Sequence, residues 1–251
     1  MNKIIILIIT LAILTLIILG SIFLKRSREN IMTPLKIKNH NIAKKEMINM
    51  FREFVKLCDK YNINYWANGG TFIGTVRNKG FIPWDGDVDI TMPSSDIKKL
   101  EKVVTELSGY MWYQTKYNDP NYLSDIRKIR HLNYHYDDRS KKWHNGIQLD
   151  IFEISDNIYK KGRNVKYPSY YLKTITHDDI FPLKKLQFED FKVNVPNKYK
   201  KYSKLSFGDY PPKNPPLKNQ ICHEGDNGLS TCNFLLETPE WTKKMYPNLY
   251  K

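Results

Sequence analysis

One stretch, residues 66–90, constrains the fold of this chain more than any other segment. It reads WANGGTFIGTVRNKGFIPWDGDVDI and places a glycine pair, Gly69-Gly70, ahead of an apolar run. That run carries an aspartate at every second position: Asp85, Asp87 and Asp89. Because side chains two residues apart lie on one face of a strand, the spacing predicts a row of carboxylates. The surrounding apolar residues favour a central strand with an enclosed polar face over an edge strand with its acids in solvent.

A row of carboxylates predicts a metal site. Adjacent negative charges repel one another, and a divalent cation relieves that repulsion. Hard carboxylate oxygens favour Mg²⁺ or Mn²⁺ over zinc. Asp87 and Asp89 are the predicted ligands, with Asp85 at the mouth of the strand. Phosphoryl or nucleotidyl transfer needs a further carboxylate, and Asp150 in the apolar segment QLDIF is the best candidate.

The segment between the glycine pair and the aspartates predicts phosphate binding. Gly69 and Gly70 let the main chain approach an anion, and Thr71 begins a short helix that ends at Arg77, whose first N–H groups point toward it. Arg77 and Lys79 can hold a diphosphate while charge moves to the leaving group. The alternative is a plain turn with two surface cations.

The remaining pattern predicts an α/β fold of the α+β kind, with a mixed sheet. Apolar residues at three- and four-residue spacing predict an amphipathic helix over 42–58, and a serine cap predicts another over 96–107. Predicted strands cover residues 63–67, 83–93, 110–117, 123–130 and 147–152. Repeated prolines predict a loop-rich segment over 180–216.

The N-terminus predicts a membrane anchor. Residues 4–24 contain no charge, and about 20 apolar residues suffice to cross a bilayer. A cleaved signal peptide is the alternative, but its apolar region is usually shorter. A polar linker over 25–35 and a catalytic domain over 36–251 are expected to follow. Basic residues after residue 24 favour a cytoplasmic domain, while a lumenal arrangement stays open, so the side of the membrane is not assigned.

Net charge and cysteine content exclude fewer classes of function than the motifs do. A net charge of +14 suits anionic lipids, polyphosphate substrates or nucleic acid, or only a lysine-rich surface. Because the membrane span does not suit RNA, nucleic acid is not the expected partner. The three cysteines, Cys58, Cys222 and Cys232, form neither a disulfide framework nor paired metal-ligand spacing.

The motifs resemble those of the LicD family, which includes fukutin and the fukutin-related protein. The matching string is W-x-x-GGT-x-x-G-x-VR-x-KGFIPWD-x-D-x-DI, followed by G-x-x-x-DIF from Gly146, and the likeness covers about residues 60–216. The resemblance implies a nucleotidyltransferase-like fold, with Asp87 and Asp89 as the metal-binding pair and Asp150 as the third carboxylate. Gly86 and Glu153 depart from the family's usual acid and proline at these positions.

The resemblance implies a membrane-anchored, metal-dependent phosphotransferase. It would move a phosphorylated alcohol, such as phosphocholine or ribitol phosphate, from a CDP-linked donor to a glycan or glycolipid hydroxyl. Asp150 or Asp85 would take the hydroxyl proton. Two alternatives remain: a nucleotidyltransferase that adds NMP to a protein, small molecule or RNA, and a non-catalytic protein that binds glycans or nucleotides.

Overall fold

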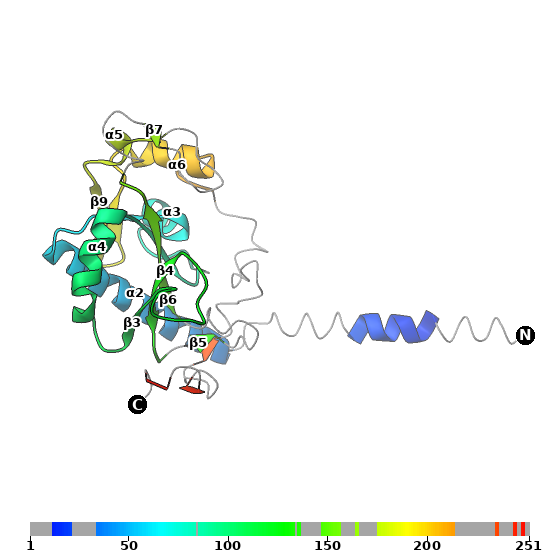
Figure 1. Cartoon of the computed structure of the whole chain (residues 1–251). Helices are drawn as coiled ribbons and strands as arrows, with labels where there is room; N and C mark the ends of the chain where they lie inside the picture. Colours follow the sequence, from blue (N-terminus) through cyan, green and yellow to red (C-terminus); the bar gives the residue numbers. More distant parts are fainter. Residues whose placement is uncertain are drawn as a thin grey trace, which may run out of the picture. The chain divides into compact units, whose positions relative to one another are not determined.

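The computed structural model divides the chain into two units, Met1–Lys38 and Asn39–Lys251. The structure describes the following residues: 12–21, 34–83, 85–133, 135–136, 147–156, 164–165, 175–213, 234–235, 243–244 and 247–248. Figure 1 draws the whole chain with its helices and strands labelled. Cys222, Cys232 and most of the predicted linker lie outside the described residues.

The membrane-anchor prediction is contradicted by the structure. Residues 12–21 are helical with exposed side chains. Among the residues that the structure describes, no helix is both long enough and apolar enough to cross a membrane. The single-pass anchor over residues 4–24, and the membrane location derived from it, are therefore withdrawn; the rest of that range is not described.

Helix α2, Pro34–Lys60, provides much of the hydrophobic core. The predicted helix over 42–58 is confirmed, and α2 extends beyond it at both ends. Its apolar stripe is buried because the three- and four-residue spacing places these side chains on one face. Phe51 lies at the centre of the stripe and makes edge contacts with Tyr65, Phe188 and Phe191.

A five-stranded mixed sheet with strand order β1-β2-β6-β4-β3 confirms the mixed α/β class. Its strands are β1 (Trp66–Ala67), β2 (Val88–Pro93), β3 (Met111–Gln114), β4 (Arg127–His131) and β6 (Gln148–Ile154). The β2–β6 pair is parallel, and the other neighbours are antiparallel. All five predicted strands exist, but most are shorter than predicted. In the parallel register Asp89 lies beside Asp150, which brings two distant acidic residues together.

Two helices frame strand β2. Helix α3, Gly69–Arg77, precedes it, and helix α4, Ser94–Val103, follows it directly and continues as a 3₁₀ turn, Val104–Glu106. Both helices contact β2, and their order agrees with the predicted helix, strand, turn, helix, strand, helix sequence. Helix α4 buries Ile97 and Leu100, so its apolar face packs toward the sheet.

The prediction that residues 180–216 are loop-rich is wrong. The segment forms an antiparallel hairpin of β9 (Lys184–Phe188) and β10 (Phe191–Val195), then helix α6 (Tyr199–Phe207). Alternating side chains explain the hairpin, because Phe188, Val193 and Val195 are buried against the core. Among the described prolines, Pro182 precedes β9, Pro196 lies between β10 and α6, and Pro211 and Pro212 follow α6.

Short paired segments complete the described chain. Strands β5 (His135–Tyr136) and β11 (Phe234–Leu235) pair antiparallel, as do β7 (Asn164–Val165) and β8 (Ile175–Thr176). Helix α5, His177–Ile180, follows β8 and begins with a capping box formed by Thr176 and Asp179. Asp179 also accepts hydrogen bonds from Lys198 and Lys201 and thereby joins α5 to α6.

Candidate active site

Three carboxylates converge where β2 and β6 lie side by side. Asp87, Asp89 and Asp150 each offer an oxygen, and these oxygens lie within 4.8 Å of one another. Asp89 and Asp150 are register partners, whereas Asp87 immediately precedes β2. We call these three residues the acidic cluster. Its all-oxygen donor set fits Mg²⁺ or Mn²⁺, as the sequence predicted.

Asp85 lies outside the acidic cluster. The sequence placed it in one row with Asp87 and Asp89, but β2 begins only at Val88. The main-chain N–H of Asp85 donates to the carbonyl of Ile82 at 3.0 Å, so the chain turns here instead of running as a strand. The two-residue alternation therefore does not hold for Asp85, although its charge still acts on the cluster.

Burial and mutual repulsion change the acidity of the cluster. Desolvation, then the charges of Asp85 and Asp150, raise the pKa of Asp87 to about 8. Burial, and then the charges of Asp87, Asp150 and Asp85, raise the pKa of Asp89 well above its ordinary value. Lys128 opposes both shifts. Without a bound cation, the fold therefore favours protonated Asp87 and Asp89 near neutral pH.

This acidity predicts an unusual pH dependence of stability in metal-free protein. Between pH 4 and 8 (roughly), the folded chain keeps a proton on Asp87 that the unfolded chain releases. The folded state binds more protons in this window, so this group's contribution to stability falls as pH rises. Melting temperatures measured in EDTA at pH 5 to 8 should fall more steeply for wild type than for Asp87→Asn. Parallel curves for the two proteins would contradict the raised pKa.

A buried lysine that sequence reasoning missed holds Asp150. The Nζ of Lys128 donates to both carboxylate oxygens of Asp150, at 2.6 and 2.7 Å. The Lys128 side chain is only 1% exposed, and it lies opposite Asp150 in the β4–β6 register. The signal was present in the sequence, because a charged residue inside a buried strand needs a partner. The pair fixes the position of one member of the acidic cluster.

The glycine pair is required by the close approach of two carboxylates. A Cβ on Gly69 would lie 2.3 Å from Asp89 Oδ2, and one on Gly70 would lie 2.2 Å from Asp85 Oδ2. Gly69 also has a φ of +48°, a conformation that side chains disfavour. Thr71 accepts a hydrogen bond from the Asp89 N–H at 2.8 Å, which ties the start of α3 to β2. The predicted role of these three residues in phosphate binding stays a prediction.

The two cations predicted to bind phosphate occupy different surroundings. The Arg77 guanidinium donates to the carbonyl of Lys213 at 3.1 Å. Burial lowers the pKa of Arg77, and the charge of Asp85 opposes that shift. Lys79 is exposed at a φ of +56°, and its carbonyl accepts from the Glu189 N–H at 2.7 Å. Neither is a member of the acidic cluster, and their phosphate role stays a prediction.

The loop before the aspartates is held by α2 and by the β9–β10 hairpin. Lys44 Nζ donates to the carbonyls of Ile82 and Pro83, at 2.9 and 2.7 Å. Burial lowers the pKa of Lys44 to about 8, against the charges of Asp85 and Glu189. Glu189 Oε1 accepts from the Phe81 N–H at 2.9 Å. These long-range contacts fix the main chain just before Asp85 and Asp87. No local sequence motif predicts them.

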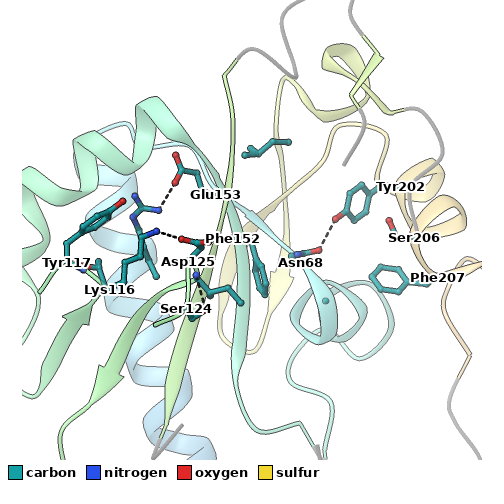
Figure 2. A pocket seen from close by; sticks show the side chains of 15 residues that line it. Asn68, Lys116, Tyr117, Ser124, Asp125, Phe152, Glu153, Tyr202, Ser206 and Phe207 are labelled. Carbon is teal, nitrogen blue, oxygen red and sulfur yellow. Dashed lines mark hydrogen bonds and ion pairs between the residues drawn. The ribbon is translucent and has the colours of Figure 1, made fainter. Parts of the chain in front are cut away.

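A cavity of about 670 Å³ adjoins the acidic cluster. Gly69 lines this cavity, and a Cβ added to it would lie 2.3 Å from Asp89 Oδ2, although no member of the acidic cluster lines the cavity itself. Figure 2 shows Phe152 and Asn68 between two walls, one with Lys116, Tyr117 and Asp125 and the other with Tyr202 and Phe207. Phe152 lies two residues beyond Asp150 on β6, on the same face of that strand.

Comparison with known protein families gives a match that covers this site. The family described as LicD/FKTN/FKRP, nucleotidyltransferase domain, matches residues 62–198, which include the whole acidic cluster. The human ribitol 5-phosphate transferase FKRP is 25% identical over 183 residues, covering 67% of this chain and 32% of the relative. The lipopolysaccharide cholinephosphotransferase LicD of Haemophilus influenzae is 36% identical over 74 residues, covering 30% of this chain and 25% of the relative.

The chain thus spans about a third or less of the length of these curated relatives. Among solved structures, it is similar to a crystal structure of the lincosamide antibiotic adenylyltransferase LnuA bound to lincomycin. That likeness has a TM-score of 0.35 and 14% identity, and covers 60% of this chain and 80% of the other. At so low a TM-score it supports no conclusion.

Proposed function

Because this chain belongs to the LicD/FKTN/FKRP nucleotidyltransferase family, we propose that it is a metal-dependent phosphotransferase. It would move a phosphorylated alcohol from a CDP-linked donor to a hydroxyl of a glycan or glycolipid. The observation that carries this proposal is the convergence of Asp87, Asp89 and Asp150 at adjacent strands. The names of two relatives support the reaction class, since one transfers ribitol 5-phosphate and the other transfers cholinephosphate.

The acidic cluster is proposed to hold Mg²⁺ or Mn²⁺. A cation bound there would neutralise charge on the donor diphosphate. Asp87 and Asp89 would lose their protons on binding, since burial and the neighbouring carboxylates raise their pKa values and the charge of a cation opposes both effects. Lys128 keeps the carboxylate of Asp150 oriented toward the same point by bonding both of its oxygens.

The remaining predicted residues receive roles in the transfer. The acceptor hydroxyl oxygen forms a bond to the phosphorus that carries the alcohol, while the bond from that phosphorus to CMP breaks and CMP leaves. We assign the hydroxyl proton to Asp85 rather than Asp150, because both oxygens of Asp150 already accept from Lys128. The helix α3 N-terminus has no side-chain cap, so Gly69, Gly70 and Thr71 can offer main-chain N–H groups to the diphosphate.

Arg77 and Lys79 are proposed to complete the phosphate site. Both lie at the end of α3, beside the turn that leads to the aspartates. Their charge would attract an anionic donor toward the acidic cluster.

A nucleotidyltransferase is the second candidate, favoured by the description of the matching family domain. The two reactions leave different products, which decides between them. Purified protein should be incubated with Mg²⁺ or Mn²⁺ and either CDP-alcohols or free CTP and ATP. The proposal expects metal-dependent release of CMP from a CDP-alcohol. Release of pyrophosphate from CTP or ATP would instead establish NMP transfer, and no turnover of any nucleotide would support a binding protein.

Metal binding should also be visible without turnover. Mg²⁺ or Mn²⁺ binds only the folded site, so it stabilises the protein by RT ln(1 + [M]/Kd), about 2.7 kcal/mol at one hundred times Kd. The thermal shift on adding metal is expected for wild type and absent for Asp89→Asn. Asp190→Asn is the matched control, because Asp190 is 70% exposed and pairs with Arg52 far from the cluster in sequence. An equal shift in Asp89→Asn would remove Asp89 from the ligand set.

A further inference from the structure

The residue at the N-cap of α3 is an asparagine that does not cap the helix. Asn68 holds this position with an extended backbone, at φ −128° and ψ 175°. An asparagine there ordinarily accepts a hydrogen bond from the N–H of the second or third helical residue, here Gly70 or Thr71. The Asn68 side chain makes no such bond. The N-terminus of α3 is therefore open, although the sequence supplies a residue that could close it.

The missing cap bond is explained by Tyr202 of helix α6. The Tyr202 hydroxyl donates to Asn68 Oδ1 at 3.0 Å, and this is the oxygen that a cap bond would use. Figure 2 shows Tyr202 reaching toward Asn68 from α6, with a dashed line between the two side chains. The two residues are 134 positions apart in the sequence, so the fold and not a local motif brings them together.

Tyr202 is held in place by packing as well as by this bond. It is 2% exposed, and its ring makes an edge contact with Phe72 of α3, with centroids 4.9 Å apart. Phe72 also stacks on Phe207, so two aromatic residues of α6 pack on one residue of α3. Because the buried ring fixes the direction of its hydroxyl, the bond to Asn68 costs little further ordering.

The N–H groups at the start of α3 are the ones proposed to hold the donor diphosphate. The Phe72 N–H donates to the Asn68 carbonyl at 2.8 Å, which is the first bond of the helix. The N–H groups of Gly69, Gly70 and Thr71 therefore have no acceptor within α3. Both glycines are half-buried, and Gly69 lines the cavity. A cap bond from Asn68 would occupy one of the same donors.

We propose that Tyr202 is a positioning residue that prevents Asn68 from capping α3 and so leaves the N–H groups of Gly70 and Thr71 available to an anionic ligand. Its hydroxyl acts through Asn68 and does not touch that ligand. Without the hydroxyl, Asn68 Oδ1 turns to the helix and competes with the anion for one donor. This inference rests on the proposed function, in which the anion is the diphosphate of the CDP-linked donor, and it assigns part of the donor affinity to a residue of a distant helix.

Titration calorimetry of the full chain with inorganic pyrophosphate and Mg²⁺ tests the inference without turnover. Tyr202→Phe keeps the ring against Phe72 and removes only the hydroxyl. It should weaken pyrophosphate binding about fivefold, the factor by which an N-cap bond of typical strength favours the capped helix. Adding Asn68→Ala to Tyr202→Phe should restore the affinity to within about twofold of wild type, because alanine cannot cap.

Hydrogen exchange detects the cap directly in protein without ligand. The Gly70 or Thr71 amide should exchange more slowly in Tyr202→Phe than in wild type, and the added Asn68→Ala should abolish the difference. If the hydroxyl served only to tie α6 to α3, its loss would leave these amides unchanged or speed their exchange. Tyr110→Phe is the matched control, because it removes a tyrosine hydroxyl that donates to Glu53 on α2 and lies outside the cavity lining.

CMP-release assays separate this inference from the proposed function. Tyr202→Phe should raise the KM for the CDP-alcohol about fivefold and leave kcat within about twofold, since the lost interaction holds bound donor. Unchanged pyrophosphate affinity in Tyr202→Phe, a loss that Asn68→Ala does not reverse, or an equal loss in Tyr110→Phe would overturn the inference. Absence of pyrophosphate binding to wild type would also overturn it. The expected binding pattern without any CMP release would instead defeat the transferase proposal and leave the role of Tyr202 standing.

Discussion

Replacing Asp87 or Asp89 by asparagine is expected to reduce turnover of a CDP-alcohol by roughly 10²–10³-fold or more, the usual cost of removing one charge-stabilising group from a reacting centre. Each substitution keeps the size of the side chain but removes a carboxylate from the acidic cluster. Since both aspartates are destabilised by burial and by neighbouring charges, neither variant should lose folding stability. Metal-dependent CMP release, measured beside the melting temperature in EDTA, checks both parts.

Asp190→Asn is the control for these two variants, because it removes an exposed aspartate of the hairpin turn. Its turnover should match wild type. Retention of more than about one tenth of the activity in both cluster variants would defeat the metal-site proposal, since even a single lost stabilising group costs more than that. A marked loss of stability would show that Asp87 or Asp89 serves the fold instead.

Much of the fold was predictable because it depends on local periodicity. The sequence carries the apolar stripe of α2 and the buried runs of β2 and β6 at helix and strand spacing. All three elements exist, although α2 is longer and β2 shorter than predicted. Asp89 and Asp150 could be predicted to share one site, since each is a charged residue inside a buried strand, and they are register partners in the structure. A parallel pairing of the two strands was enough to make them neighbours.

Other features depend on contacts between distant segments. Asp85 does not lie in the predicted row of carboxylates, because the chain turns after Ile82 and β2 begins only beyond that turn. Lys44 from α2 holds the turn by a hydrogen bond to the Ile82 carbonyl. Gly69 and Gly70 are required because carboxylates 15 or more positions later in the sequence lie against them. A local motif does not predict such contacts. The hairpin of β9 and β10 was mistaken for loop because its prolines, which flank the strands, outweighed a short alternation of apolar residues.

The membrane prediction failed for a different reason. It was drawn from hydropathy alone, and among the residues that the structure describes no helix is both long enough and apolar enough to cross a membrane. Charge-based reasoning about orientation depended on that span and is withdrawn with it. The expectation that nucleic acid is not a partner also used the span and loses that support.

Lys128→Met should cause the largest loss of stability among single substitutions near the site. Removing one partner of a buried ion pair typically costs about 3–5 kcal/mol, because the remaining charge is left uncompensated. Here the remaining charge is Asp150, whose two hydrogen bonds from Lys128 would be lost beside Asp87 and Asp89. Urea denaturation in EDTA should show a lower midpoint with an unchanged slope.

The double variant Lys128→Met with Asp150→Asn distinguishes the ion pair from simple packing. If the pair is responsible, removing the charge of Asp150 should recover a large part of the lost stability, and the two substitutions should be strongly non-additive. Mg²⁺ should also stabilise Lys128→Met more than wild type, since the cation takes over the role of the buried ammonium group at Asp150. Additive losses, together with an unchanged metal response, would show that Lys128 fills space beside β6 and does not position the acidic cluster.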